Sequence, residues 1–201
     1  MNNKITPQAF ILIGRSGSGK GTQANLLIAK LKELDPSRET LYIQTGQEFR
    51  KFIQGDSYTE KRSAQYMKDG KLQPNFLAIK MWVDYLVDKF NGNEHVIFDG
   101  SPREWHEAGV LDSVFGFYGF GKPHVIDLYI SDEEALKRLL LRKRMDDSEE
   151  GIKKRLAWYK ECVEPTIKYF HDKKEYHFLK INGEQTPEQI FKDIAKGVGL
   201  V

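Results

Sequence analysis

The sequence has little cysteine, little net charge and no long apolar run, and each shortage excludes a class of protein. Cys162 is the single cysteine among 201 residues, so no internal disulfide is available and the fold must depend on its own core. The formal net charge of +2 gives no general attraction for nucleic acids or membranes. No window approaches the roughly 20 apolar residues that span a bilayer, and residues 1–6 lack the features of a signal peptide. We therefore expect a cytoplasmic protein without nucleic-acid or membrane partners, and nothing in the sequence demands more than a monomer.

The rest of the composition is that of one globular domain, residues 1–201. Hydrophobic residues make up 40% of the chain and charged residues 30%, which is ordinary for a protein with one well-buried core. Short apolar runs alternate with longer segments of helical period, the pattern of a parallel sheet covered by helices on both faces. The runs expected to form its five strands are residues 9–13, 40–44, 95–98, 125–130 and 177–181. The sequence therefore predicts a three-layer α/β fold.

Two stretches have a purely helical pattern. Residues 45–93 are longer than a single crossover helix requires, so we expect a small helical insertion that projects from the sheet. After the fourth strand, residues 132–143 and 148–173 each predict a helix. Asp147 is expected to cap the second of these helices, and Pro165 is expected to kink or divide it.

The strongest local signal is a glycine-rich segment, GRSGSGKGT at residues 14–22, between an apolar run and an amphipathic segment. Several N–H donors must converge to bind phosphate oxygens, and only a glycine-rich turn lets the backbone curl closely enough. The following helix adds the partial positive charge of its N-terminus, Lys20 can bridge the outer phosphates, and Thr22 offers a hydroxyl near a magnesium site. A simple tight turn would not need a lysine after three spaced glycines. We therefore interpret the segment as a phosphate-binding loop (P-loop), which by itself does not identify the acceptor.

Five sequence blocks together make the chain resemble the adenylate kinases and related nucleoside monophosphate kinases. In chain order, the blocks are GKGTQ at 19–23, TG at 45–46 with Arg50, GKL at 70–72, DGSPR at 99–103, and RMDD at 144–147 with Arg155. The first is the family's form of phosphate loop, and the next two resemble the segments that receive the monophosphate. The fourth resembles an Asp-Gly-Phe-Pro-Arg block, and the last resembles the Arg-x-Asp-Asp signature and a later arginine. The resemblance extends over nearly the whole chain.

The resemblance implies a P-loop kinase fold, and transfer of the terminal phosphoryl group of ATP to a nucleoside monophosphate, first of all AMP, with Mg²⁺ as cofactor. Such a reaction needs positive charge around two polyanions, and guanidinium groups remain charged and bind phosphate in a planar fork. The residues implied for catalysis are Lys20, Arg103, Arg142, Arg144 and Arg155. Those implied for ATP are Gly14, Ser16, Gly17, Ser18, Gly19, Lys20, Gly21, Thr22, Arg138 and Arg142. Those implied for the monophosphate are Thr45, Gly46, Arg50, Lys71, Leu72, Gly100, Arg103 and Glu107, and those for magnesium, in part through water, are Thr22 and Asp99.

Glu107 departs from the family pattern at a position that affects the choice of base. The family has glutamine four residues after the arginine of the fourth block, whereas this chain has glutamate. A glutamine amide both donates and accepts, which suits adenine, but an ionised glutamate only accepts, which suits the adjacent donors of guanine. GMP is therefore an alternative acceptor, unless the side chain of Glu107 points away from the base. Ser101 in place of phenylalanine and Gln47 in place of aspartate also fall on the acceptor side.

The lid that closes over ATP in the family is reduced to a vestige, residues 142–147. Only Lys143 separates Arg142 from Arg144. Because a lid excludes water, we expect more ATP hydrolysis without transfer, or a stronger dependence on closure of the 45–93 insertion. The short lid also leaves open a nucleotide-binding regulatory module with little turnover as the alternative to an enzyme.

Overall fold

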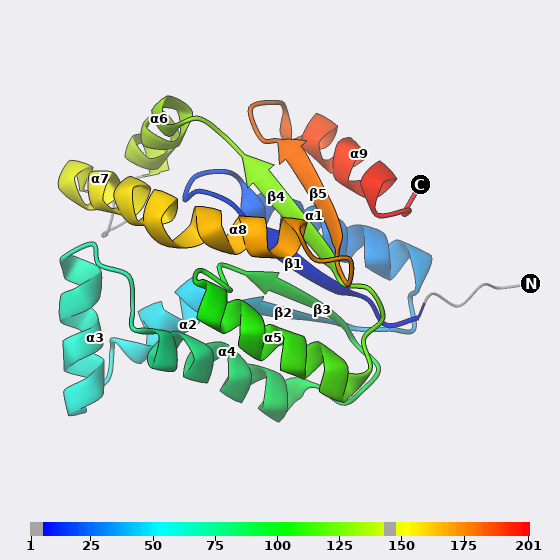
Figure 1. Ribbon diagram of the computed structural model, residues 1–201, viewed down its shortest axis with the longest axis horizontal. Helices are drawn as coiled ribbons and strands as arrows, with labels where there is room; N and C mark the ends of the chain where they lie inside the picture. The colour runs from blue at the N-terminus through cyan, green and yellow to red at the C-terminus, as the bar shows by residue number, and fades with distance from the viewer. Residues whose placement is uncertain (1–5, 143–147) are drawn as a thin grey trace, which may run out of the picture.

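The structure is a computed structural model, which describes residues 6–142 and 148–201. Within these residues the chain forms a five-stranded parallel sheet with the strand order β2-β3-β1-β4-β5 (Figure 1). The strands are β1 (Ala9–Ile13), β2 (Thr40–Gln44), β3 (His95–Asp99), β4 (His124–Tyr129) and β5 (His177–Asn182). Each lies within one residue of its expected bounds, so the predicted sheet is confirmed.

Helices cover both faces of the sheet. They are α1 (Lys20–Leu34), α2 (Thr45–Phe52), α3 (Tyr58–Lys68), α4 (Asn75–Lys89), α5 (Trp105–Tyr118), α6 (Asp132–Arg142), α7 (Glu149–Trp158), the π-helical turn η1 (Tyr159–Val163), α8 (Glu164–His171) and α9 (Pro187–Gly197). None of the helices in the described part of the chain is long and apolar enough to cross a membrane.

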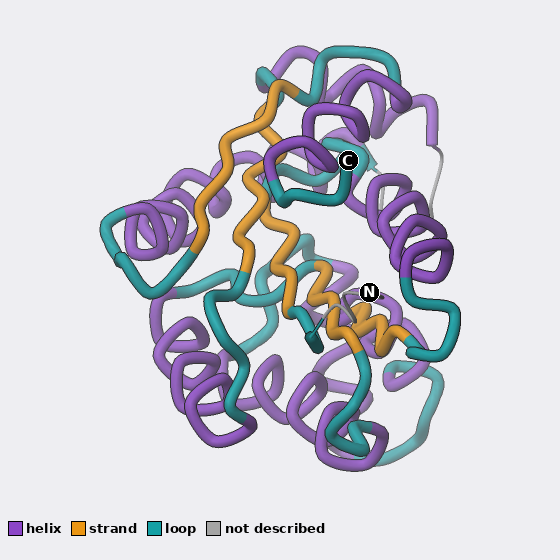
Figure 2. Tube along the Cα trace, turned by 90° about the vertical axis from the view of Figure 1, so that its right-hand side faces the viewer, coloured by secondary structure: helices purple, strands orange, loops and turns teal. Residues whose placement is uncertain are grey.

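The strands supply two hydrophobic cores because their successive side chains point to opposite faces. Ile11 of β1 belongs to the core that includes residues of α4, α5 and α8. Its neighbours Phe10 and Leu12 belong to the core shared with α1 and α9. Figure 2 shows the strands between these two layers of helices. The predicted three-layer α/β fold is confirmed.

Between β2 and β3 the chain forms α2, α3 and α4, where the sequence predicts a helical insertion. Ser57 and Glu60 form a reciprocal capping box that starts α3, which lies farthest from the sheet in Figure 1. Phe49 of α2 packs on Leu77 and Ala78 of α4 in a small separate core. This arrangement gives the insertion an apolar interior of its own.

The long helix expected over residues 148–173 forms α7, the π-helical turn η1 and α8, which follow one another without a break. Ser148 Oγ accepts from Gly151 N at 3.1 Å and caps α7, so the prediction of Asp147 as the cap is wrong by one residue. Asp147 itself lies outside the described residues. The π-helical turn η1 closes with a bond from Glu164 N to Tyr159 O, directly before Pro165. Because proline has no N–H to donate to the preceding turn, it favours such a change of helical geometry. The kink or division expected at Pro165 takes the form of this π-helical turn, and the helix continues through it.

Candidate active site

The candidate site lies at the carboxyl ends of the central strands. Residues 14–19 follow β1, Thr45 follows β2 and Asp99 ends β3. In the sheet register, Asp99 pairs with Leu12 of β1 on one side and with Gln44 of β2 on the other, so the segments that follow these strands begin side by side. Parallel sheets bind ligands at this edge, in the crevice outside the strand ends.

The phosphate loop has the backbone that its glycines predict. Gly17 and Gly19 have φ values of 87° and 95°, in a region that favours glycine. Gly14 has φ 143°, and a Cβ atom there would lie 2.5 Å from the carbonyl oxygen of Leu128. Helix α1 begins at Lys20, so its N-terminal N–H groups face the loop. The loop therefore presents backbone donors and a helix terminus to one space, as an anion site requires.

Lys20 lies across this loop. Its ammonium group donates to Gly14 O at 2.8 Å and to Arg15 O at 2.9 Å. Burial lowers the pKa of Lys20 to about 8, with further lowering by Arg103 and Arg142, while Asp99 opposes the change. Like charges are thus held together around Lys20, and an anion bound among them would raise its pKa again.

Two cavities open above the loop. The larger has a volume of about 630 Å³ and is lined by Ser16, Gly17, Gly19, Lys20, Gly21, Thr22, Asn25, Tyr42, Gln44, Gly46, Gln47, Asp99, Gly100, Arg103, Arg138 and Arg142. The smaller has a volume of about 120 Å³ and is lined by Ser16, Gly46, Phe49, Arg50, Met67, Gly70, Lys71, Gln73, Arg103, Arg142, Arg155 and Trp158. Arg103 and Arg142 line both, so the two cavities adjoin at a pair of guanidinium-bearing residues.

Arg103 and Arg50 approach each other beside Gly46. A Cβ atom on Gly46 would lie 3.6 Å from Arg50 Nη1 and 3.8 Å from Arg103 Nη2, so both guanidinium groups lie close to this glycine. Arg103 is fixed by a 2.8 Å bond from its Nε to Gly100 O, and its guanidinium lies 5.6 Å from the centre of the Trp158 ring. Burial lowers the pKa of Arg103, and Arg155 and Arg50 lower it further. The junction of the cavities is therefore a desolvated cluster of positive charge.

Asp99 and Thr22 line the larger cavity together with Lys20. The carboxylate of Asp99 accepts from Tyr42 Oη at 2.9 Å, and burial and this neighbouring carboxylate raise the pKa of the Tyr42 phenol, so Tyr42 remains a donor. In residues 6–142 and 148–201 no cluster of three or more His, Cys, Asp or Glu side chains could hold a metal by itself. One carboxylate and one hydroxyl fit Mg²⁺, which keeps several waters and binds phosphate oxygens.

Most residues implied by the resemblance line one of the two cavities, but several do not. Ser18 and Thr45 are buried, and Thr45 Oγ1 is 2.8 Å from the hydroxyl of Ser101. Glu107 is 1% exposed, and its carboxylate accepts from Arg103 N at 3.1 Å, within its own turn. Leu72 lines neither cavity. Arg144 lies outside the described residues, as does all but the first residue of the expected lid, 142–147.

Several residues that line the cavities are not predicted from the sequence. Phe49, Met67 and Trp158 provide apolar surface beside Arg50 in the smaller cavity, and Tyr42 reaches Asp99 from the neighbouring strand in the larger. The pairing of β2 with β3 could have suggested the contact of Tyr42, because Tyr42 lies in the strand next to the one that Asp99 ends. No local pattern singles out Trp158.

A P-loop at a strand end, with a second cavity joined to it through arginines, defines a phosphotransferase that accepts two anionic substrates. The sequence model of the adenylate kinase family matches residues 12–175. Similar proteins include the adenylate kinase of Azobacteroides pseudotrichonymphae genomovar. CFP2, 33% identical over 93% of this chain and 95% of the relative. They also include adenylate kinase of Bacteroides fragilis, 34% identical over 94% and 97%, and adenylate kinase 1 of Nostoc sp., 30% identical over 94% and 98%. The chain belongs to the adenylate kinase family and is a phosphotransferase.

Proposed function

We propose that this enzyme transfers the terminal phosphoryl group of ATP to AMP, giving two molecules of ADP. One observation carries the proposal. Arg103 and Arg142 line both the larger cavity, which Lys20 also lines, and the smaller cavity, which Arg50 also lines. A phosphoryl group at this junction would have arginines beside both its donor and its acceptor, as a loose, charged transition state requires.

The larger cavity suits the donor triphosphate. Its wall is the phosphate loop and the N-terminus of α1, with Lys20 next to the position expected for the outer phosphates. On ATP binding, Lys20 would exchange its bonds to Gly14 O and Arg15 O for phosphate oxygens. Arg138 and Arg142 on α6 also line this cavity.

The smaller cavity suits the acceptor nucleotide. Arg50, Lys71 and Arg103 provide charge for one phosphate, while Phe49 and Met67 provide apolar surface for a base. No general base is needed, because the acceptor phosphate is already anionic at neutral pH. The role of residues 45–93 as the acceptor-binding insertion is part of this proposal.

Asp99 and Thr22 would hold Mg²⁺, in part through water, with Tyr42 orienting the carboxylate. When bound, Mg²⁺ neutralises charge on the donor phosphates. We propose a monomer, because nothing in the sequence demands a partner subunit. The single cysteine, Cys162, agrees with a reducing compartment, and we propose a cytoplasmic enzyme.

GMP is the second candidate acceptor, because Glu107 stands where the family has glutamine. Two observations favour AMP. Glu107 accepts from Arg103 N, and it lines neither cavity. The relatives that cover nearly the whole chain are named adenylate kinases.

A transfer assay tests the proposal. The chain is incubated with ATP labelled on its terminal phosphate, Mg²⁺ and AMP, GMP, CMP, UMP or dTMP in parallel, and labelled diphosphates are separated. We expect the highest kcat/KM with AMP. A higher kcat/KM with GMP would overturn the proposal of AMP as the acceptor. If none of the five monophosphates gave a labelled diphosphate, the result would favour the regulatory module instead. Release of labelled phosphate without acceptor measures the hydrolysis expected from the short lid.

A further inference from the structure

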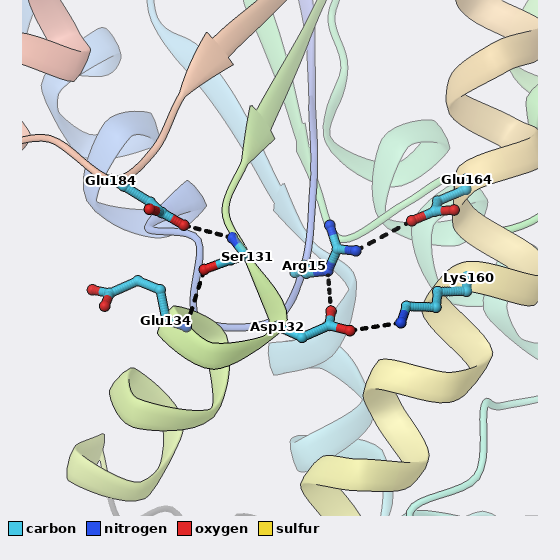
Figure 3. Close-up of polar contacts among 7 residues, drawn as sticks. All are labelled: Arg15, Ser131, Asp132, Glu134, Lys160, Glu164 and Glu184. Atoms are coloured by element: carbon cyan, nitrogen blue, oxygen red, sulfur yellow. Dashed lines mark hydrogen bonds and ion pairs between the residues drawn. The ribbon is translucent and has the colours of Figure 1, made fainter.

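Arg15, the second residue of the phosphate loop, lines neither the larger nor the smaller cavity. Its side chain is 9% exposed. Its Nε donates to Asp132 Oδ1 at 2.8 Å and its Nη2 to Glu164 Oε1 at 3.2 Å (Figure 3). The guanidinium also lies 4.4 Å from the centre of the Tyr159 ring. A buried charge without partners is costly, and here two carboxylates and an aromatic face compensate the charge of Arg15.

The partners of Arg15 come from three different elements. Asp132 begins α6, Tyr159 begins η1 and Glu164 begins α8. The π-helical turn is needed for Tyr159 and Glu164 to reach the same side chain, because residues five apart on a regular α-helix point about 140° apart. The wider turn, closed by the bond from Glu164 N to Tyr159 O, brings these two side chains to the same guanidinium.

The main chain of Arg15 touches the reactive side of the loop. Its carbonyl oxygen accepts from Lys20 Nζ at 2.9 Å and from Ser18 N at 3.1 Å. One residue therefore connects the catalytic lysine to α6, η1 and α8. A shift of the side chain would also shift the carbonyl that Lys20 contacts.

Helix α6 carries two arginines that line the larger cavity, Arg138 and Arg142. It packs closely on the phosphate loop, since a Cβ atom on Gly17 would lie 3.3 Å from both Ala135 O and Leu139 Cγ. Helix α7, which leads into η1, carries Arg155 on the smaller cavity. The spacing of these arginines from the loop depends on how α6 and η1 are held at Asp132 and Tyr159.

We propose that Arg15 is a positioning residue for phosphoryl transfer: it fastens the arginine-bearing helices to the phosphate loop through Asp132, Glu164 and Tyr159. The proposal rests on the proposed transfer from ATP. Removing the Arg15 guanidinium lets α6 and η1 move relative to Lys20, so that the arginines no longer meet the transferring group in the right geometry.

The start of α6 also has an anchor that does not involve Arg15. Glu184 accepts from Ser131 N at 2.6 Å, and Ser131 Oγ accepts from Glu134 N at 3.3 Å (Figure 3). Helix α6 should therefore still form when Arg15 is replaced. We expect the replacement to disturb the positions of the arginines on α6 and α7, while the protein still folds.

The test compares Arg15→Met and Arg15→Lys with a matched control, Lys160→Met. Lys160 bonds to the other oxygen of Asp132 at 2.6 Å, but it is 55% exposed and no contact with the phosphate loop is found for it in the described structure. The measurements are kcat, the KM for ATP and for AMP, and the melting temperature. Arg15→Met should lower kcat at least tenfold while the KM for AMP stays within twofold, because the three charges proposed for the acceptor phosphate, Arg50, Lys71 and Arg103, lie outside the helices that Arg15 fastens. Arg15→Lys, which keeps one charge but cannot bind both carboxylates, should fall between, and Lys160→Met should stay within twofold of the wild type.

A double variant makes the test specific. In Arg15→Met with Asp132→Asn, kcat should be no lower than in Arg15→Met alone, because both changes remove the same contact. If Arg15→Met does not fold, Asp132→Asn and Glu164→Gln decide, and each should lower kcat severalfold. A kcat within twofold of the wild type in the folded Arg15 or Asp132 variants, with a change in melting temperature alone, would overturn the proposal. Absence of any transfer by the wild type would instead refute the proposed function.

Discussion

Replacing Lys20 by methionine should abolish phosphoryl transfer and also stabilise the free protein near neutral pH. In the wild type, burial is the main cause that lowers the pKa of Lys20 from 10.5 to about 8, and the nearby charges of Arg103 and Arg142 contribute to the lowering. At about 1.4 kcal/mol per pKa unit, this corresponds to a cost of at most about 3.5 kcal/mol. The variant loses two hydrogen bonds to carbonyl groups beside an open cavity, where water can replace the ammonium. We therefore expect a net gain of about 1–2 kcal/mol at pH 7.

The pH dependence distinguishes this cause from a general packing effect. Because the folded pKa of Lys20 lies below the unfolded one, the unfolded chain binds more protons between pH 8 and 10.5. Wild-type stability therefore receives a contribution that rises with pH in this window, and the advantage of Lys20→Met should be full below pH 8 and should shrink toward pH 10.5.

Urea unfolding of both proteins at several pH values measures the difference directly. Lys30→Met on the same helix is the control, because Lys30 forms a surface pair with Glu33 at 2.9 Å whose removal should change stability by at most about 1 kcal/mol. A Lys20→Met protein less stable than the wild type at pH 7, or with an advantage that does not change up to pH 10, would refute the reasoning.

Three further predictions concern activity. Since free Lys20 loses its proton above a pKa of about 8, kcat/KM for ATP should fall by about tenfold for each pH unit above that value, and a flat profile to pH 10 in initial-rate assays would contradict this. Tyr42→Phe removes the donor to Asp99, so the Mg²⁺ concentration for half-maximal rate should rise about tenfold while the KM for AMP is unchanged; an unchanged Mg²⁺ titration would remove Tyr42 from the metal site. Glu107→Gln keeps an acceptor for Arg103 N, so the ratio of kcat/KM for AMP and GMP should change less than about threefold, and a switch of acceptor would show that Glu107 reads the base.

The features that the sequence could predict are those set by neighbouring residues. The glycines at 14, 17 and 19 determine the phosphate loop because each has a backbone that favours glycine. The strands were predictable because each is a short apolar run, as in β1, whose five residues are all buried. The cap of α7 was missed by one residue, because Asp147 and Ser148 are both good caps and only the backbone selects between them.

The contacts that complete the site were not predictable, because they join residues far apart in the chain. Arg15 meets Asp132 and Glu164 across 117 and 149 residues. The Trp158 ring centre lies 5.6 Å from the Arg103 guanidinium, although Arg103 precedes α5 and Trp158 ends α7. Such pairs depend on the assembled fold, and no periodicity or motif in one segment signals them.

The measurement that tests the account most directly is an initial-rate study with ATP varied at several fixed concentrations of AMP. If the two cavities must be filled together, the double-reciprocal lines should intersect, and the protein should carry no label after incubation with ATP labelled on its terminal phosphate in the absence of AMP. Parallel lines together with a labelled protein would show that the phosphoryl group first passes to the protein, which would contradict direct transfer at the junction of Arg103 and Arg142.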